Sequence, residues 1–105
     1  MTKSTLDVLT EAYHLLDDKK RWTQGALARD FFGEAVSEQA ATAVAFCAAG
    51  AVYRVIPSGK ICWDALDLLE DVVEEDLTIV NDGPDGYRRI RAAFRKAIRS
   101  LGGKP

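Results

Sequence analysis

Apolar residues recur at helical spacing in the first part of the chain. From Leu6 to Leu16 they fall every three or four positions, which is the period of one face of an α-helix. Ser4 stands at the position of an N-cap, and Asp7 follows at the position of the acidic partner in a capping box. The pattern predicts a helix from Ser4 to about Asp18.

From Ala40 to Val52, in the middle of the chain, every residue is apolar, small or threonine. A helix that is apolar on all sides is normally buried. We therefore predict a buried central helix from Ser37 to about Val55, with Ser37 as its N-cap. Gly50 would cost this helix about 1 kcal/mol relative to alanine, so its presence indicates either close packing or a kink.

The second half of the chain predicts two more helices. Apolar residues recur at helical spacing in both, and the predicted bounds are Asp64 to about Glu75 and about Pro84 to Leu101. Gly102 suits the position after the second helix. Two short apolar runs, Ile61–Trp63 and Leu77–Val80, predict an extended piece and a short strand.

The connections between these helices are less regular. Trp22–Gly25 has the composition of a turn, and Ala26–Phe32 predicts a short helix. Asn81–Gly86 is dense in turn-forming residues and supplies Asp82 and Asp85 as candidate N-caps.

Together these elements predict an all-α or mainly α fold. The 105 residues are 48% apolar and 29% charged, which is an ordinary globular composition with enough apolar surface for one modest core. We expect a single globular helical domain over residues 1–105. It would be a compact bundle of about four helices around the Ala-rich central helix, with one short extra helix or strand pair.

Targeting and membrane signals are not evident. The first residues lead straight into an amphipathic segment that contains Asp7 and Glu11, whereas a signal peptide needs an uninterrupted apolar stretch. The longest nearly uncharged run, Gln39–Tyr53, is too short and too weakly apolar to span a bilayer. We therefore expect a cytoplasmic protein without a membrane partner.

Candidate catalytic or metal-binding chemistry is sparse. Cys47 and Cys62 have neither zinc-binding nor redox spacing, and a reducing compartment predicts that both are free, buried thiols. His14 is the single histidine, and no orienting residue is indicated that would make it a base for Cys47. We expect no catalytic residue, no metal site and no cofactor.

Charge is distributed unevenly along the second half. Residues 64–85 hold nine acidic and no basic side chains, whereas residues 86–105 hold seven basic and no acidic ones. Opposite charges favour pairing of these helices, within one chain or across a homodimer. The basic face could instead meet another acidic partner or a nucleic acid, but a net charge of −2 argues against nucleic acid. The candidate interaction residues are Arg88, Arg91, Arg95 and Arg99.

A cluster of polar residues lies between the first two predicted helices among apolar neighbours. Buried amide and charged groups must find partners. One interpretation is that these groups tie a loop onto the helix bundle while the indole fills the core. The other is that they line a small pocket for a polar ligand. The candidate binding residues are Trp22, Gln24, Arg29 and Asp30, with Asn81 and Asp82 from the later turn.

Three pieces of the chain form a recognisable pattern: residues 22–30 (WTQGALARD), residues 45–52 (AFCAAGAV) and the pair Asn81-Asp82. This pattern resembles a small bacterial family known as domain of unknown function 6197. The resemblance implies a bacterial, cytoplasmic, stand-alone domain, and it carries no known activity, substrate or cofactor. It also groups Cys47 with the candidate binding residues as one cluster.

These observations favour a small cytoplasmic, non-enzymatic binding or interaction module that self-associates or binds a partner protein. An alternative is a small-ligand sensor or small enzyme that uses a polar pocket near residues 22–30. A second alternative is nucleic-acid binding through the basic C-terminal helix.

Overall fold

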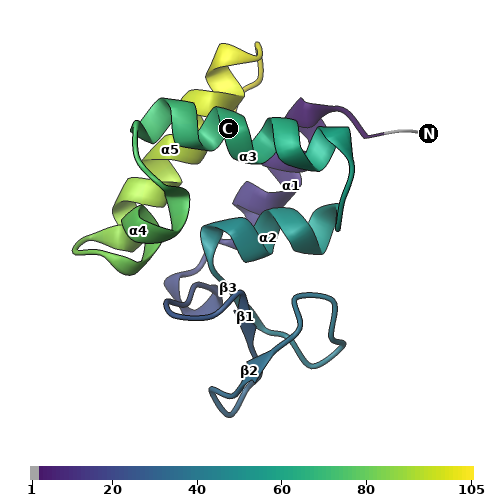
Figure 1. Cartoon of the computed structure of the whole chain (residues 1–105), viewed down its shortest axis with the longest axis vertical. Helices are drawn as coiled ribbons and strands as arrows, with labels where there is room; N and C mark the ends of the chain where they lie inside the picture. The colour runs from purple at the N-terminus through teal and green to yellow at the C-terminus, as the bar shows by residue number, and fades with distance from the viewer. Residues whose placement is uncertain (1–2) are drawn as a thin grey trace.

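The structure is a computed structural model that describes residues 3–105. The prediction of a mainly helical fold is confirmed, and a small three-stranded antiparallel sheet accompanies the helices (Figure 1). The elements of the described residues are helices α1 (Thr5–Leu15), α2 (Ala48–Val55), α3 (Lys60–Val73), α4 (Leu77–Asp82) and α5 (Gly86–Ser100), the 3₁₀-helix η1 (Lys19–Arg21), and strands β1 (Ala28–Arg29), β2 (Ala35–Val36) and β3 (Ala45–Phe46).

The longer helices pack on one another around a shared core. α1 contacts α2, α3 and α5, and α3 also lies against α5. Each helix contributes one apolar face, so each helps to keep the others in place. The small sheet projects from this helical body at the lower end of Figure 1. The largest side chains of the core include Leu9, Leu16, Leu69, Ile90 and Phe94.

α1 begins where the sequence predicts. The Ser4 hydroxyl accepts the Asp7 N–H at 3.1 Å, and the Asp7 carboxylate accepts the Ser4 N–H at 3.0 Å, which completes the capping box. The hydrogen bonds from Ser4 hold the pKa of Asp7 below its usual value because they favour the ionised carboxylate.

The predicted central helix from Ser37 is wrong over its first half. Residues 37–44 form turns, β3 follows, and α2 begins only after Cys47. A continuous apolar run can be buried as a helix, a strand or a loop, so periodicity could not distinguish these conformations. The Ser37 hydroxyl accepts the Gln39 N–H at 3.1 Å within a turn and caps no helix.

Contacts from other parts of the chain hold this irregular segment. Arg54 donates to the carbonyls of Glu38 and Ala40 at 3.0 and 2.8 Å. Gly50 lies so close to the chain before β1 that an added Cβ would stand 1.9 Å from the Leu27 carbonyl oxygen. Close packing, one of the two expectations for Gly50, is therefore confirmed.

α3 begins earlier than predicted, at Lys60 rather than Asp64. The extended piece predicted at Ile61–Trp63 is wrong, because these residues form the first turn of this helix. Gly59 has a φ of 98°, which lets the chain turn sharply into the helix. An ion pair of 2.7 Å between Lys60 and Asp64 then supports the first turn.

α4 replaces the short strand predicted at Leu77–Val80. The Asp76 carboxylate accepts two N–H groups of the first turn, at 2.9 and 3.2 Å, and so caps the helix. Leu77 and Val80, three positions apart, are buried, whereas Ile79 is 65% exposed. This burial follows a helix rather than the alternation of a strand.

α5 has nearly the predicted bounds. The prediction that Gly102 follows the helix is confirmed, since its φ is 85° and its N–H donates to the Arg99 carbonyl at 2.9 Å. Of the two candidate N-caps, Asp85 holds the N-cap position of α5 without a capping side-chain bond, and Asp82 is the last residue of α4. No helix within residues 3–105 is long and apolar enough to cross a membrane.

The helix predicted over Ala26–Phe32 is wrong, because this segment contains β1. Ala28 lies opposite Val36 of β2 and opposite Phe46 of β3, which gives the sheet order β2-β1-β3. Each strand is only two residues long, which is too short for a detectable alternation of apolar and polar positions, so the local pattern did not reveal the sheet. The loop of residues 30–34 joins β1 to β2 and forms the tip of a hairpin that points away from the helices (Figure 1).

Candidate functional site

Asn81 is the buried polar centre that joins the hairpin to the helices. It is 1% exposed. Its Oδ1 accepts the Trp22 indole N–H and the Ala48 backbone N–H, both at 2.9 Å. Its Nδ2 donates to the Thr23 carbonyl and the Asp82 carboxylate, both at 3.0 Å. All four hydrogen-bonding positions of the amide are therefore filled.

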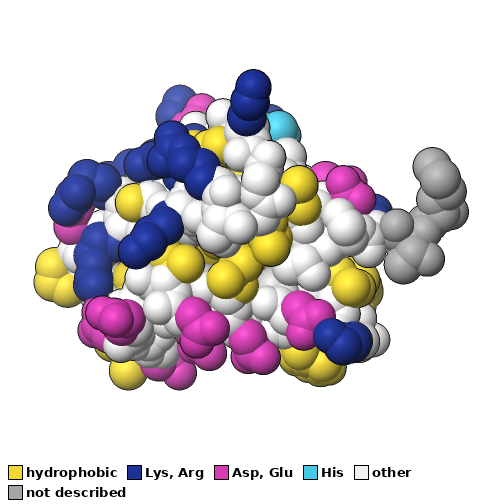
Figure 2. All heavy atoms as spheres, turned by 90° about the horizontal axis from the view of Figure 1, so that it is seen from above, with side chains coloured by type: hydrophobic (Ala, Val, Ile, Leu, Met, Phe, Trp, Pro, Cys, Tyr) yellow, Lys and Arg dark blue, Asp and Glu magenta, His cyan; other side chains and the backbone are white. Residues whose placement is uncertain are grey.

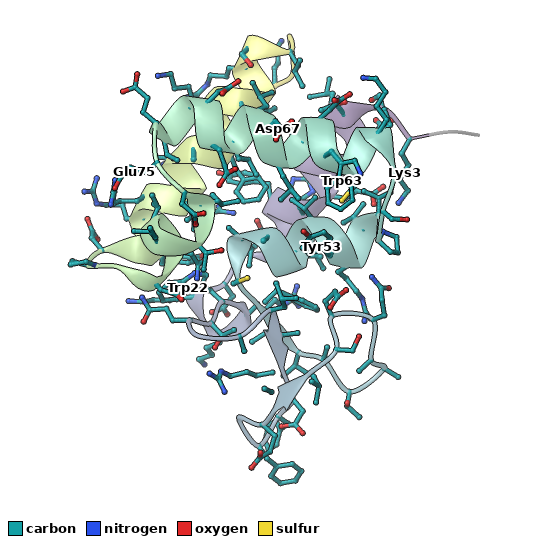
Figure 3. The ribbon with its side chains drawn as sticks, in the orientation of Figure 1. Lys3, Trp22, Tyr53, Trp63, Asp67 and Glu75 are labelled. Atoms are coloured by element: carbon teal, nitrogen blue, oxygen red, sulfur yellow. The ribbon has the colours of Figure 1, made fainter. Side chains whose placement is uncertain are left out.

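Gln24 and Asp82 add further contacts between the same segments. Gln24 Nε2 donates to the carbonyls of Asn81 and Gly83 at 3.1 and 3.3 Å, and the Asp82 carboxylate accepts the Gly25 N–H at 3.1 Å. Figure 3 shows the Trp22 side chain where the hairpin region meets α4. The structure thus brings four of the six candidate residues together, and their bonds are those that the loop-tying interpretation requires. The four are Trp22, Gln24, Asn81 and Asp82.

An open cavity of about 400 Å³ lies beside this cluster. Trp22 and Tyr87 line it with their ring centroids 5.5 Å apart. Lys19 adds a positive charge, whereas Arg88 is paired with Asp85 in the cavity wall. The Tyr87 hydroxyl donates to the Leu16 carbonyl at 2.6 Å, and burial raises the pKa of this phenol. An aromatic wall beside the Lys19 ammonium suits a small anionic aromatic compound.

Arg29 is bonded to Gln24 of the Asn81 cluster and spans the hairpin. Its guanidinium donates to the Thr23 hydroxyl at 2.9 Å, the Gln24 carbonyl at 3.0 Å and the Gly33 carbonyl at 3.0 Å. A planar guanidinium with three acceptors fixes their relative positions. Arg29 therefore fastens the tip of the hairpin to its base.

Asp30 shapes the turn at the tip. Its Oδ1 accepts the N–H groups of Phe32 and Glu34 at 2.9 and 3.0 Å, and its own N–H donates to the Glu34 carbonyl at 2.9 Å. Within residues 3–105 none of its hydrogen bonds leads to Asn81 or Asp82. The structure places Asp30 in the turn next to Arg29, and none of its bonds within residues 3–105 leads to the candidate residues around Asn81.

Two phenylalanines stand at this tip. Phe31 is 84% exposed and Phe32 is 85% exposed, and their rings meet edge to face with centroids 5.6 Å apart. Neither was a predicted site residue, and the sequence predicted a short helix over this segment. The signal in the sequence was the pair itself: two adjacent aromatic residues between Asp30 and Gly33, in a stretch rich in turn-forming residues.

Cys47 and Cys62 are buried free thiols, as predicted. Burial raises the pKa of both thiols because it disfavours the thiolate. Cys47 Sγ accepts the Gly50 N–H at 3.2 Å and so caps α2, whereas His14 is exposed on α1. A buried, protonated thiol is a poor nucleophile. Among the described residues, no three His, Cys, Asp or Glu side chains gather closely enough to hold a metal ion.

The candidate arginines of α5 have different surroundings. Arg91 has a side chain only 17% exposed, lies 3.8 Å from the centroid of the Tyr13 ring and donates to the Tyr13 carbonyl at 2.9 Å. Arg95 donates to the Tyr13 hydroxyl at 3.3 Å. Arg88 and Arg99 are exposed. Two of the four arginines therefore help to pack α5 against α1.

α3 and α5 are neighbours, and their charges lie on adjacent parts of the surface. Figure 2 shows acidic side chains along one side of this face and basic ones along the other, with apolar side chains between them. Glu75 and Arg89 form an ion pair of 2.6 Å across this boundary. An open groove of about 250 Å³, here called the α3–α5 groove, is lined by Val72, Val73, Arg88, Arg89, Ala92, Ala93 and Lys96.

Comparisons with known proteins identify a family. No curated protein and no solved structure matches the chain. A family model described as "Family of unknown function (DUF6197)" matches residues 1–100, so the resemblance to this family is confirmed. The matched residues include the hairpin, the Asn81 cluster and all five α-helices of the described part of the chain. The chain therefore belongs to the DUF6197 family, a family of unknown function.

Proposed function

We propose that this domain is a non-enzymatic protein-interaction module whose contact element is the hairpin tip, residues 30–34. The observation that carries this proposal is the exposure of Phe31 and Phe32, at 84% and 85%. Apolar surface left in water forgoes about 25 cal/mol per Å² of stabilisation. Adjacent exposed aromatic rings are therefore typical of a surface that is buried in a complex.

The polar residues around the hairpin support this proposal because they order the tip in advance. Arg29 bonds Gly33 to the base of the hairpin, and Asp30 bonds the backbone of the turn. Asn81 and Trp22 attach that base to α4. An element that is already ordered loses little conformational entropy on binding. In this proposal the predicted ligand-binding residues act as the support of a protein-binding tip.

The charge of the tip indicates the kind of partner. Asp30 and Glu34 flank the two rings, so the tip combines apolar surface with negative charge. Anionic membranes and nucleic acids repel such a surface. The partner surface is expected to be an apolar depression with a basic rim.

Site-specific photo-crosslinking in living cells tests the proposal. The variant Phe32→p-benzoylphenylalanine places the crosslinker at the tip, and Ile79 on α4, 65% exposed, provides a matched apolar control position. We expect a discrete crosslinked species of defined mass from position 32 and none from position 79. Equal products from both positions, or none from either, would contradict the proposal.

A second variant separates binding from folding. With the crosslinker moved to Glu34, Phe31→Ser combined with Phe32→Ser should abolish the crosslinked species. Both rings are exposed, so the thermal unfolding midpoint should stay close to that of the unsubstituted protein. A crosslinked species that persists without the rings would show that they do not carry the contact.

The cavity beside Trp22 favours a second candidate function, the binding of a small ligand. Trp22 and Tyr87 with the Lys19 ammonium suit an aromatic carboxylate. The chain has two tryptophans, so in Trp63→Phe protein the fluorescence of Trp22 can be followed alone. Titration with benzoate should give a saturable change that Lys19→Glu weakens, whereas a linear response would count against a site.

A further inference from the structure

Resting on the proposed function, we infer that the hairpin tip of one copy docks into the α3–α5 groove of a second copy. The hairpin tip and the α3–α5 groove both present apolar surface to solvent. Val72 and Ala92 are among the residues that line the groove, which opens to solvent and has a volume of about 250 Å³. A phenyl ring placed there leaves water, and the cations of the rim can lie against its face.

The charges of the two surfaces are complementary. Arg88 and Arg89 already pair with Asp85 and Glu75. Lys96 also lines the groove and forms no ion pair within residues 3–105. At the tip, Glu34 is exposed and pairs with no cation of the described residues. A contact between copies therefore joins Glu34 of one to Lys96 of the other.

Two other contacts of the hairpin tip fit less well. Docking of one tip against another would bring Asp30 and Glu34 of both copies together, and like charges at close range oppose association. The groove of the same chain is out of reach, because the tip and the helices α3 and α5 lie toward opposite ends of the 38 Å long axis (Figure 1). The contact is thus head to tail.

A head-to-tail contact has a defined consequence for assembly. Because each copy carries both a tip and a groove, repeated docking gives a ring or an open chain rather than a closed dimer. A single hairpin tip covers less area than a standard interface, so the association is weak and depends on protein concentration.

Sedimentation velocity over a hundredfold range of concentration provides the first test. We expect the weight-average sedimentation coefficient of the full chain to rise with concentration. Phe31→Ser combined with Phe32→Ser should weaken the association about a hundredfold, since two aromatic contacts are lost. A full chain that stays monomeric throughout would overturn the inference.

Exchanging the charges of Glu34 and Lys96 tests whether the hairpin tip meets the α3–α5 groove. Glu34→Lys places a lysine tip opposite a lysine groove, and Lys96→Glu places a glutamate tip opposite a glutamate groove. Each variant alone should associate about tenfold more weakly, because an attraction becomes a repulsion. Mixed in equal amounts, the two variants have opposite charges at every contact between unlike copies, so association should rise above that of either variant alone. Arg99→Glu is the matched control and should leave association unchanged, because this exposed arginine of α5 does not line the groove.

The outcomes separate this inference from the proposed function. If the mixture fails to recover although each variant is folded, the tip does not meet the α3–α5 groove and the inference is wrong. If the purified protein stays monomeric while position 32 still crosslinks to a different protein in cells, the interaction module stands and the second copy is excluded as its partner. If position 32 forms no discrete product and the protein is monomeric, both ideas fail.

Discussion

At the scale of single residues, one buried amide decides how the hairpin sits on the helices. Asn81 receives bonds from Trp22 and Ala48 and donates to Thr23, so it links segments that are distant in the sequence. Trp22 and Asn81 are 59 positions apart. A buried amide with four partners stabilises one arrangement strongly, because each lost partner leaves a polar group unsatisfied away from water.

Asn81→Ala should lower the free energy of unfolding by about 3–5 kcal/mol, since the indole N–H of Trp22 and the N–H of Ala48 lose their acceptor. Urea unfolding followed by circular dichroism measures this change. Trp22→Phe is the control, because it removes one of these bonds and keeps most of the ring, and it should cost about 1 kcal/mol. Equal losses for the two variants would contradict the role given to Asn81.

The Cys47 thiol should make stability depend on pH in the alkaline range. Burial raises its pKa in the folded protein above the usual value of 9.0. As pH rises past that usual value, the unfolded chain loses the thiol proton while the folded chain keeps it. The free energy of unfolding therefore falls with increasing pH until the pH exceeds the raised pKa.

Urea unfolding at a series of pH values above 9 measures this dependence, and Cys47→Ala should show a shallower decline than the unsubstituted protein. The pKa values of Cys62, Tyr53 and Tyr87 are also raised by burial. All three groups are present in the two proteins, so the difference between the slopes reports Cys47. Identical slopes would mean that the thiol does not titrate differently on unfolding.

At the scale of elements, amphipathic helices with local caps were predictable, and elements held by distant partners were not. α1 and α5 carry their apolar faces and their terminal signals within their own sequence. β1 forms because β2 and β3 come to lie beside it. The segment before α2 is apolar throughout, so its pattern fits several conformations and only its contacts select one.

Gly50→Ala provides a test at this scale. Helix propensity alone would make alanine more favourable than glycine by about 1 kcal/mol. We expect instead a loss of at least about 2 kcal/mol, because the new Cβ would meet the Leu27 carbonyl oxygen at 1.9 Å and would push the hairpin from α2. Chemical denaturation measures the difference. Ala92→Gly on the exposed face of α5 is a control. It should lower the free energy of unfolding by about 1 kcal/mol, which is the difference in helix propensity alone.

At the scale of the whole molecule, the basic charge of α5 divides between packing and solvent. Arg91 and Arg95 bond to Tyr13 of α1, whereas Lys96 and Arg99 are exposed. Reversal of several α5 arginines at once would therefore disturb the fold as well as any interface. The exchange between Lys96 and Glu34 avoids this difficulty.

Arg91→Glu should destabilise the protein by about 2–3 kcal/mol, because it removes the stacking on Tyr13, breaks the hydrogen bond to the Tyr13 carbonyl and places a carboxylate near Asp17. Arg99→Glu, the exposed match on the same helix, should change stability by less than about 0.5 kcal/mol. Thermal unfolding of the two variants measures the contrast. Similar midpoints would place the Arg91 guanidinium in solvent rather than against α1.

The sequence by itself determined the mainly helical class, the capped start of α1, the amphipathic α5 and the buried thiols. Each of these depends on interactions within a few residues or on simple burial, and such interactions leave a local pattern. The tertiary structure alone decided the hairpin, the course of residues 37–47 and the exposure of Phe31 and Phe32. The strands are only two residues long, the tip depends on particular bonds from Arg29 and Asp30, and residues 37–47 are held by contacts with other segments. A pattern of apolar and polar positions specifies none of these contacts.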